Sequence, residues 1–397
     1  MVNASAALET GKHIDPASLT IGIHDSLASL AEDWQDFERT AVATLYQTYL
    51  WCEAWQQTCG TARGTAPRIA VIRGASGEIL AILPLQIRTA LGFRVLEWLG
   101  SPHSGYGYGL FSPQAVAEAD HWVPWTFPRI LDRIGGFDAA ALTDMPAVMF
   151  DADHPLASCF TLRSANLSFQ MMLDSDFETL HARKRDGEDR RAARKKEERL
   201  GLSGEVAFDL PCSRDEVHTV LDVMFDHQKD RMGELGVRGV STPAERDFLH
   251  RIADRQDAAD PVLLPYRLRC GDETLAVMLG GRHANVFWAL ISSLAGGPTR
   301  KFSPGDLALR KTIKSCCGMG LERLDFSVGD SSYKRAWADT EIHLYHHLSA
   351  RNFRGLIYVC ATGIRMTVKR WVKTTPALLT LSLAVRRTLF GKRTVSR

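Results

Sequence analysis

The sequence predicts an α/β protein, of the α+β kind, that consists of two domains and a basic helical tail. Three observations lead to this prediction. The chain has 397 residues, more than a single hydrophobic core of about 100–200 residues normally contains. Its composition, 45% apolar and 24% charged, is that of a globular protein and excludes a disordered or fibrous chain. Helical and extended patterns also follow one another along most of the chain.

The first half begins with helical patterns and continues with extended ones. The expected elements are helices over residues 27–40 and 46–57 and strands over 68–73, 79–87 and 93–99. The Gly- and Ser-containing residues 74–77 predict the turn between the first two strands. Pro84 lies inside the second run and makes it an edge strand or a bulge. Residues 100–109 alternate Gly and Tyr and predict a loop.

The second half predicts the order helix, helix, strand, strand, strand, loop, helix, strand. The expected elements are helices over 214–231 and 242–253, strands over 263–270, 275–283 and 285–290, a loop over 292–305, a helix over 306–317 and a strand over 321–327. Gly318 and Gly320 end the last helix.

A charged segment, residues 177–200, separates the halves. It has nine Lys or Arg and five acidic residues between Arg183 and Arg199. The spacing predicts a solvated helix face with ion pairs; binding of phosphate-bearing ligands or RNA is the alternative. We therefore expect a disordered leader over 1–18, domains over 19–165 and 166–350, and a tail over 351–397.

The tail differs from the body in charge. Residues 351–397 contain eleven Lys or Arg and no acidic residue, so residues 1–350 have a net negative charge. Ile364, Val368 and Trp371 recur at helical spacing, Pro376 breaks the pattern, and a second apolar stripe begins at Leu378. Such helices lie on anionic membrane surfaces, although packing on the acidic body is also possible.

The chain's beginning and its cysteines predict the cytoplasm, with peripheral association on the inner membrane as an option. No basic segment followed by an apolar one opens the sequence, and no apolar run approaches 18 residues. The eight cysteines include no C-x-x-C pair, which predicts reduced, mostly buried thiols. The acidic body argues against nucleic acid as its partner.

Four stretches resemble the GNAT-like acyltransferases associated with bacterial cellulose and exopolysaccharide biosynthesis, which are related to the Fem-type peptidyltransferases. They are Tyr49–Trp55, Arg183–Gly201, Phe302–Asp306 and Leu324–Trp337. The resemblance covers roughly residues 20–350. It implies two tandem GNAT-like domains that carry an acyltransferase activity, with acetyl-CoA or another acyl-CoA as co-substrate and no metal.

The loop before Asp306 lies where a GNAT fold holds the pyrophosphate of coenzyme A. Backbone N–H groups at a helix start attract phosphate. The candidate donor-binding residues are Arg300, Lys301, Ser303, Gly305 and Asp306. The usual pattern contains more glycine, and Pro304 removes one donor, so a plain helix start capped by Ser303 is the alternative.

The candidate catalytic residues follow the strand at 321–327. A Tyr333 hydroxyl can protonate a departing thiolate, Asp330 can act as base, and Lys334 can stabilise negative charge. The pattern Tyr333-Lys334-x-x-Trp337 is similar to the Phe-Lys-x-x-Phe of Fem-type enzymes, in which the lysine lies in the substrate cleft. A surface turn with an anchoring aromatic pair is the alternative.

The acceptor site is expected to contain His103, Tyr106, Tyr108 and Trp337, because sugars stack on aromatic rings. A mobile connector is the alternative for the loop at 100–109. His343, His346 and His347 have spacings that can place two imidazoles on one helix face, but structural histidines are favoured over a metal site.

The function predicted from these features is acyl transfer from a coenzyme A thioester to an amine or hydroxyl of a sugar or cell-envelope precursor. Transfer is expected to be direct, without a covalent enzyme intermediate, since no nucleophile motif occurs. Two alternatives remain: a Fem-like transferase that uses aminoacyl-tRNA, and a non-catalytic scaffold of a polysaccharide synthase at the membrane.

Overall fold

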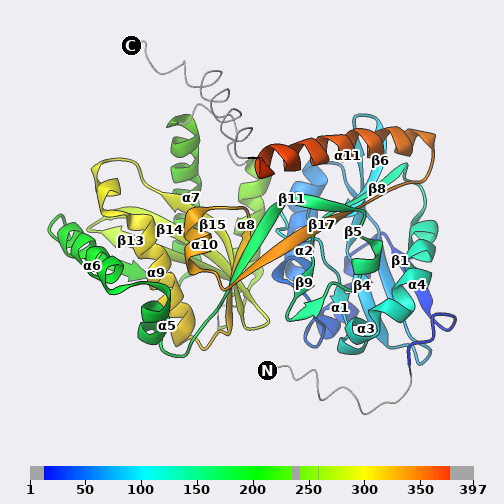
Figure 1. Cartoon of the computed structure of the whole chain (residues 1–397), viewed down its shortest axis with the longest axis horizontal. Coiled ribbons are helices and arrows are strands. Elements are labelled where there is room, and N and C mark those ends of the chain that lie inside the picture. Colours follow the sequence, from blue (N-terminus) through cyan, green and yellow to red (C-terminus); the bar gives the residue numbers. More distant parts are fainter. Residues whose placement is uncertain (1–12, 235–241, 258, 376–397) are drawn as a thin grey trace, which may run out of the picture. The chain divides into compact units, whose positions relative to one another are not determined.

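The computed structural model of the chain describes residues 13–234, 242–257 and 259–375 (Figure 1). It divides into two compact units: unit 1 is Met1–Leu167 with Ile342–Trp371, and unit 2 is Ser168–Glu341 with Val372–Arg397. These are not the continuous ranges expected from the sequence. Residues after 341 return to unit 1 because strand β17 (Thr340–Ala350) pairs with β8 (Ala139–Pro146).

Unit 1 contains most of the short strands. They are β1 (Thr20–His24), β2 (Ala66–Pro67), β3 (Ile69–Arg73), β4 (Ile79–Leu83), β5 (Leu85–Ala90), β6 (Phe93–Trp98), β7 (Leu110–Phe111), β8, β9 (Val148–Met149), β10 (Ala152–Asp153), the first half of β11 (Leu162–Met172) and most of β17. One sheet has the order β1-β3-β4-β7, and a second has the order β17-β8-β6-β5-β2. As expected, Pro84 interrupts the 79–87 run, so that β4 and β5 join different sheets.

The helices of unit 1 lie between these strands in the chain. They are η1 (Ala28–Leu30), α1 (Ala31–Glu38), η2 (Leu45–Gln47), α2 (Tyr49–Trp55), η3 (Gln56–Gly60), α3 (Pro113–Ala117), α4 (Ala119–Ile134), η4 (Ala157–Cys159) and α11 (Phe353–Thr374). α4 is not predicted from the sequence, because Pro124 and Pro128 lie inside it and prolines usually indicate a helix boundary.

Unit 2 consists of a sheet with the order β12-β13-β14-β15-β16-β11 and its helices. The elements are α5 (Phe177–Lys184), α6 (Gly187–Gly201), β12 (Val206–Asp209), α7 (Arg214–Glu234), α8 (Pro243–Arg255), β13 (Leu263–Cys270), β14 (Glu273–His283), β15 (Val286–Leu294), η5 (Pro298–Phe302), α9 (Pro304–Gly318), β16 (Arg323–Val328) and α10 (Ser332–Trp337). The predicted order of the second half is therefore confirmed from α7 to β16.

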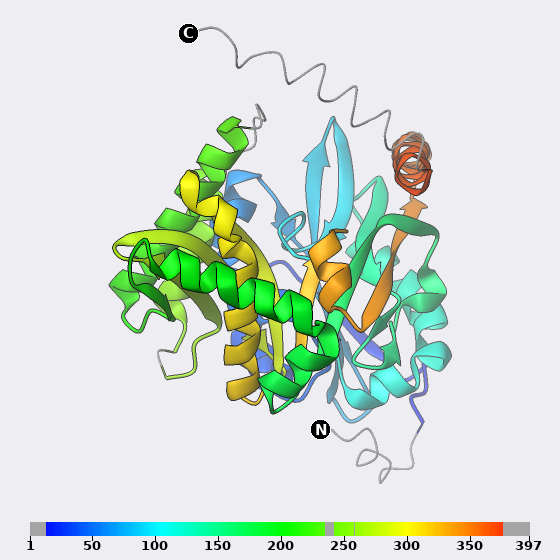
Figure 2. The same ribbon diagram turned by 60° about the vertical axis from the view of Figure 1, so that its left-hand side comes forward.

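Local sequence signals explain several boundaries in unit 2. Thr242 and Glu245 form a capping box at the start of α8. The Asp186 side chain accepts a hydrogen bond from the Asp189 N–H, which caps α6 and divides the charged segment into two helices. α7 and α9 both pack against β13, β14 and β15. Figure 2 shows α6 crossing α9.

Two predictions about the ends of the chain change. Ile14 belongs to the expected leader, yet its side chain is buried and its N–H donates to the Glu118 carboxylate at 2.7 Å. The ordered part therefore begins before residue 18. The tail starts as the expected helix, α11, but the second apolar stripe from Leu378 onward lies outside the described residues.

The three histidines of the metal hypothesis lie on β17 and not on a helix. His346 accepts a hydrogen bond from the Asp144 N–H, His347 contacts the Cys159 carbonyl at 2.7 Å, and His343 lies 2.8 Å from Arg163. All three have structural partners. Among the described residues, no group of three or more His, Cys, Asp or Glu is arranged to hold a metal ion.

Candidate active site

The parallel pair β15–β16 forms the centre of the candidate site. Its recorded pairs run from Val286↔Arg323 to Trp288↔Asp325, although both strands continue beyond that point. The side chains of β15 are buried as far as Trp288, and the next three are half-buried. Within the described residues, the two strands thus stop pairing midway, which leaves backbone groups of β15 beyond Trp288 without a partner on β16.

Local irregularities mark the same level of the sheet. Leu279 pairs with Ile291 and Gly280 with Ala289, so Leu290 is an extra residue in β15, a β-bulge. On β16, Ser327 has a φ of 59°, a left-handed conformation that is costly for a residue with a side chain. Bulges and strained residues of this kind occur frequently beside binding sites.

Asp325 explains how Ser327 keeps this conformation. Its carboxylate is completely buried and accepts hydrogen bonds from the Ser327 N–H at 2.6 Å and from the Gln170 amide at 2.8 Å. Gln170 lies on β11, the strand that pairs with β16. The buried carboxylate therefore holds the end of β16 in place.

Lys334 of α10 contacts the same strand end. Its ammonium group donates to the Ser327 and Val328 carbonyls, both at 3.2 Å, and the residue is only 9% exposed. Burial lowers the pKa of Lys334, and the negative charges of Asp325 and Asp330 oppose that shift. The lysine thus fixes α10 to β16 beside the point where the two strands stop pairing.

Asp330 is held by a cation. Arg335 donates two hydrogen bonds of 2.7 Å to its two carboxylate oxygens, and these hydrogen bonds lower the pKa of Asp330. A carboxylate that holds its proton less tightly is a weaker general base. The geometry therefore favours a structural role for Asp330 over the predicted catalytic one, which stays a prediction.

Tyr333 is accessible, whereas Trp337 is not. The Tyr333 side chain is 42% exposed, packs against Phe326 with the ring centres 6.3 Å apart, and has its pKa raised by burial, so it remains a protonated hydroxyl. Trp337 is completely buried; the His181 ring stacks on it, and the Arg185 guanidinium lies 4.7 Å from its ring centre. α5 and α10 are joined through this tryptophan.

The predicted donor-binding residues surround the start of α9, but most are already engaged. The Ser303 carbonyl accepts from the Asp306 and Leu307 N–H groups, and Lys196 donates to the Ser303 hydroxyl at 3.0 Å. Pro304 has no N–H. Gly305 then supplies the first-turn N–H that remains for a ligand, within the part of the chain that the structure describes.

The remaining residues of this group also have partners. Arg300 donates to the Ala295 carbonyl at 3.0 Å, Lys301 lies over the Phe302 ring, and Asp306 lies 3.5 Å from Arg310. A Cβ added at Gly305 would approach Leu294 of β15 to 3.0 Å. The helix start offers fewer free amides than the sequence led us to expect, and the strand opening becomes the more important feature.

The residues of the predicted acceptor loop lie in unit 1. Tyr106 and Tyr108 are completely buried, and Gly107 is enclosed, because a Cβ there would lie 2.2 Å from Trp98. His103 accepts a hydrogen bond from the Trp55 indole at 2.9 Å. Residues 106–109 of the loop are thus part of the core, and a contact of Tyr106 or Tyr108 with an acceptor would require the core to open, whereas His103 is half-buried.

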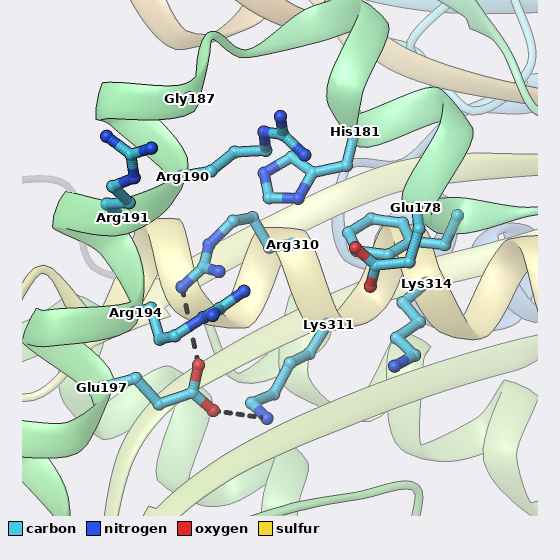
Figure 3. A pocket seen from close by; sticks show the side chains of 11 residues that line it. Glu178, His181, Gly187, Arg190, Arg191, Arg194, Glu197, Arg310, Lys311 and Lys314 are labelled. Atoms are coloured by element: carbon cyan, nitrogen blue, oxygen red, sulfur yellow. Dashed lines mark ion pairs between the residues drawn. The ribbon is translucent and has the colours of Figure 1, made fainter.

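Two adjoining cavities lie among α5, α6 and α9 of unit 2 (Figure 3). The larger has a volume of about 430 Å³ and the smaller about 300 Å³; His181 and Arg310 line both. The Arg-rich segment was predicted as a solvated face, with a phosphate site as the alternative. The structure shows that one side of this helix lines a cavity.

Sequence reasoning missed Asp325, Gln170 and His181. Asp325 had a detectable signal, since it is an acidic residue within the otherwise apolar run Leu324–Phe326. Gln170 and His181 had none, because their roles depend on partners more than 150 residues away in the chain.

Comparisons with known proteins identify the domain that contains these residues. Residues 187–335 match the family model of the acetyltransferase (GNAT) domain, a range that lies within unit 2. No curated protein sequence matches the chain.

Solved structures with the same fold cover both units. FemX matches with a TM-score of 0.55 and 12% identity over 82% of this chain and 96% of FemX. The C-terminal domain of a putative lysylphosphatidylglycerol synthetase from Agrobacterium fabrum matches with a TM-score of 0.52 and 12% identity, over 85% of this chain and 96% of that domain. A conserved protein of unknown function from Bacteroides thetaiotaomicron matches with a TM-score of 0.50 and 11% identity, over 84% of this chain and 100% of that protein.

At these identities the similarity shows the fold alone. The predicted fold class, α/β with two GNAT-like units in tandem, is confirmed. With its acetyltransferase domain in unit 2, the protein is an acyltransferase by class.

Proposed function

We propose that unit 2 transfers an acyl group from a coenzyme A thioester to an amine or hydroxyl group. The observation that carries this proposal is the end of the β15–β16 pairing at Trp288↔Asp325, beside the Leu290 bulge. A pantetheine arm is an extended chain with amide groups, and it can hydrogen-bond to the strand edges that are exposed there. The Gly305 N–H at the start of α9 then faces the phosphates.

The proposed reaction is direct. The acceptor nitrogen or oxygen attacks the thioester carbonyl, the C–S bond breaks, and an amide or ester bond forms. An N–H near the Leu290 bulge stabilises the carbonyl oxygen as it gains negative charge. Tyr333 donates its proton to the leaving thiolate, and the acceptor's proton passes to solvent or to Asp330. Lys334 supports the site through β16.

The acceptor class follows from the resemblance of four sequence stretches to acyltransferases of cellulose and exopolysaccharide biosynthesis. We therefore propose a sugar or another cell-envelope precursor. The Fem-like use of aminoacyl-tRNA is tested in parallel, since it requires binding of tRNA and not of acyl-CoA.

The direct experiment is isothermal titration of the full chain with acetyl-CoA and with longer acyl-CoAs. We expect saturable binding that weakens when Leu290 is replaced by Pro, because proline removes the N–H at the bulge. The control is Leu294→Pro at the end of the same strand. Absence of binding by the folded wild-type protein would refute the donor assignment. Retention of tRNA at low salt in that case would favour the aminoacyl-tRNA reaction.

We also propose that α11 attaches the enzyme to an anionic membrane surface. Large apolar side chains are exposed along one face of α11, among them Phe353, Leu356, Ile357, Ile364, Val368 and Trp371. The opposite face packs on unit 1 at Gly355 and Thr362, which are buried. No described helix is long and apolar enough to cross a membrane.

The charge of α11 supports an anionic surface as the partner. The helix has Arg and Lys residues and no acidic residue, and each basic residue near an anionic surface contributes about 1 kcal/mol. Aromatic and aliphatic side chains on an interfacial helix enter the boundary between headgroups and acyl chains. The helix is suited to lie on the membrane.

Sedimentation with phosphatidylglycerol-containing vesicles tests this attachment. We expect wild-type protein to bind these vesicles and not phosphatidylcholine ones, and the triple variant Ile357→Ser, Ile364→Ser, Trp371→Ser to lose binding. The matched control replaces three exposed apolar residues elsewhere, Leu91, Trp125 and Leu202, with Ser. Equal loss in both variants, or binding to both vesicle types, would contradict a specific role of α11.

A further inference from the structure

The larger cavity of unit 2 is lined mainly by cations from two helices. α6 contributes Arg190, Arg191 and Arg194, and α9 contributes Arg310, Lys311 and Lys314. Figure 3 shows Arg194 extending from α6 toward Arg310 of α9 and Arg190 extending toward His181 of α5, while Arg191 points away from α9. The residues at 190 and 194 and those at 310 and 314 are each four apart, so each pair lies on one helix face. Two rows of positive charge therefore converge on one space.

The carboxylates of the cavity do not neutralise this charge. Glu197 lies 2.8 Å from Lys311 and 3.8 Å from Arg310, so one acid is shared by two cations. Glu178 is the other acid in the lining. No ion pair of Arg190, Arg194 or Lys314 occurs among the residues that the structure describes, and the buried Nε of Arg190 has no hydrogen-bond partner there.

His181 lies beside these cations. It lines both cavities and stacks between Phe177 and Trp337. Burial lowers the pKa of His181, and the charges of Arg310, Arg190 and Arg185 lower it further, against an opposing effect of Glu178. The imidazole is therefore neutral at pH 7, and it can donate one N–H to an anion.

This arrangement is unfavourable without an anion. Like charges on neighbouring helix turns destabilise a helix, and facing like charges from a second helix add to that cost. On an ordinary helix surface, acidic and basic side chains alternate, so that like charges are not placed next to one another. Guanidinium groups match phosphate oxygens in geometry and form charge-assisted hydrogen bonds with them.

We propose that this cavity binds the phosphate groups of a small phosphorylated molecule. Its volume of about 430 Å³ lies within the range of small-molecule sites and exceeds what a single inorganic phosphate needs. The Phe177 ring in the lining offers an apolar surface for the organic part. A long RNA would instead use an extended basic surface, whereas these cations surround a half-open cavity between two helices.

Two sources of phosphate are compatible with the position of the cavity. The smaller cavity reaches Asp306 in the first turn of α9, and Lys196 connects α6 to Ser303 there. The ligand is then either the phosphate-bearing end of the acyl donor or a separate phosphorylated molecule, such as a phosphorylated acceptor. The phosphate site itself does not depend on the proposed acyl transfer.

Calorimetric titration of the full chain with inorganic pyrophosphate tests the site. We expect one binding event per chain, weakened at least tenfold in Arg190→Gln/Arg194→Gln. The matched control is Lys195→Gln/Arg199→Gln, which removes two exposed charges from the same helix outside both cavities. The control is expected to stay within twofold of the wild type. Circular dichroism of both variants verifies that the helix is intact.

The outcomes separate the site from the proposed function. The phosphate site would be refuted, even if acyl-CoA binds, by the absence of any heat of binding with pyrophosphate. An equal loss of pyrophosphate affinity in both variants would also refute it. If coenzyme A displaces pyrophosphate and dephospho-coenzyme A does not, the cavity takes the 3′-phosphate of the donor. If pyrophosphate binds equally well with saturating coenzyme A present, the cavity takes a separate phosphorylated ligand. Binding of tRNA alone, without pyrophosphate, would also overturn the proposal.

Discussion

Units 1 and 2 share a fold class but use their polar groups differently. In unit 1 the loop at residues 100–109 is joined to the core by hydrogen bonds: Gln47 donates to the Tyr106 carbonyl at 3.1 Å, and His154 contacts the Gly107 carbonyl at 3.2 Å. In unit 2 six cations and only two acids line a cavity. Both units contain buried polar atoms without a hydrogen-bond partner among the described residues, such as the Tyr108 hydroxyl in unit 1 and the Arg190 Nε in unit 2. In unit 2 such an atom belongs to a cluster of cations around a cavity.

This difference indicates where function lies in the chain. Buried polar groups with partners stabilise a fold and specify its packing. Uncompensated charge, a bulge and a strained residue reduce stability and persist where a ligand needs them. Bulges and left-handed residues occur in both units, for example between β3 and β4 and at Asp144 in unit 1. The excess of cations around a cavity lies in unit 2, and the acetyltransferase domain match falls within that unit.

The largest effect is expected for Trp337→Ala. Because this side chain is completely buried against His181 and Arg185, its removal should cost unit 2 about 3–5 kcal/mol. Urea unfolding followed by circular dichroism measures the loss, and Trp337→Phe should recover most of it. Unchanged stability together with lost acceptor binding would instead support the predicted contact of Trp337 with substrate.

Tyr333→Phe should reduce acyl transfer by about 100-fold, the lower range for loss of a general acid. Since the ring is 42% exposed and keeps its contact with Phe326, stability should not change. Steady-state kinetics with a saturating acyl-CoA measures kcat. A variant as fast as the wild type would show that Tyr333 is not the general acid and that the leaving thiolate takes its proton from solvent.

The stability of unit 1 is expected to depend on pH through Glu38. Burial raises the pKa of this carboxyl from 4.5 to about 7, although the Tyr49 N–H donates to it. The native state therefore holds a proton that the unfolded state releases, so its stabilising effect is present below pH 4.5 and is lost as pH rises through 7. Glu38→Gln keeps the acceptor and should raise the melting temperature at pH 8 by roughly 2–4 °C.

Thermal melts of wild type and variant at pH 5 and pH 8 check this prediction. The difference between them should be small at pH 5 and appear at pH 8. Glu32→Gln on the same helix, with an exposed side chain, is the control and should show no such pH dependence. A variant that is less stable at both pH values would show that the carboxyl is ionised in the fold.

The smallest effect is expected for Asp330→Asn. Arg335 already lowers the pKa of this carboxyl, so its contribution as a base is small, and the rate should fall less than about threefold. The pH–rate profile of the variant should keep the shape of the wild-type profile. A large loss of rate, together with a change in the acidic limb of the pH–rate profile, would show that Asp330 is the general base.

The sequence by itself determined the order of elements from α7 to β16, the helical character of the charged segment apart from its break before Gly187, the break at Pro84 and the amphipathic start of the tail. These features depend on periodicity and on local signals, such as the capping box at Thr242, which act between residues close together in the chain. The motif at Leu324–Trp337 likewise marked the region where Asp325, Tyr333 and Lys334 meet.

Tertiary structure alone decided the rest. The return of β17 to unit 1, the burial of Tyr106 and Trp337, and the pairing of Asp330 with Arg335 all depend on which distant surfaces pack together. The same holds for the cavity. α6 and α9 are separated by more than 100 residues, and their cations line one cavity only because the two helices pack together. Periodicity indicates which face of a helix is polar, but it contains no information about what that face will meet.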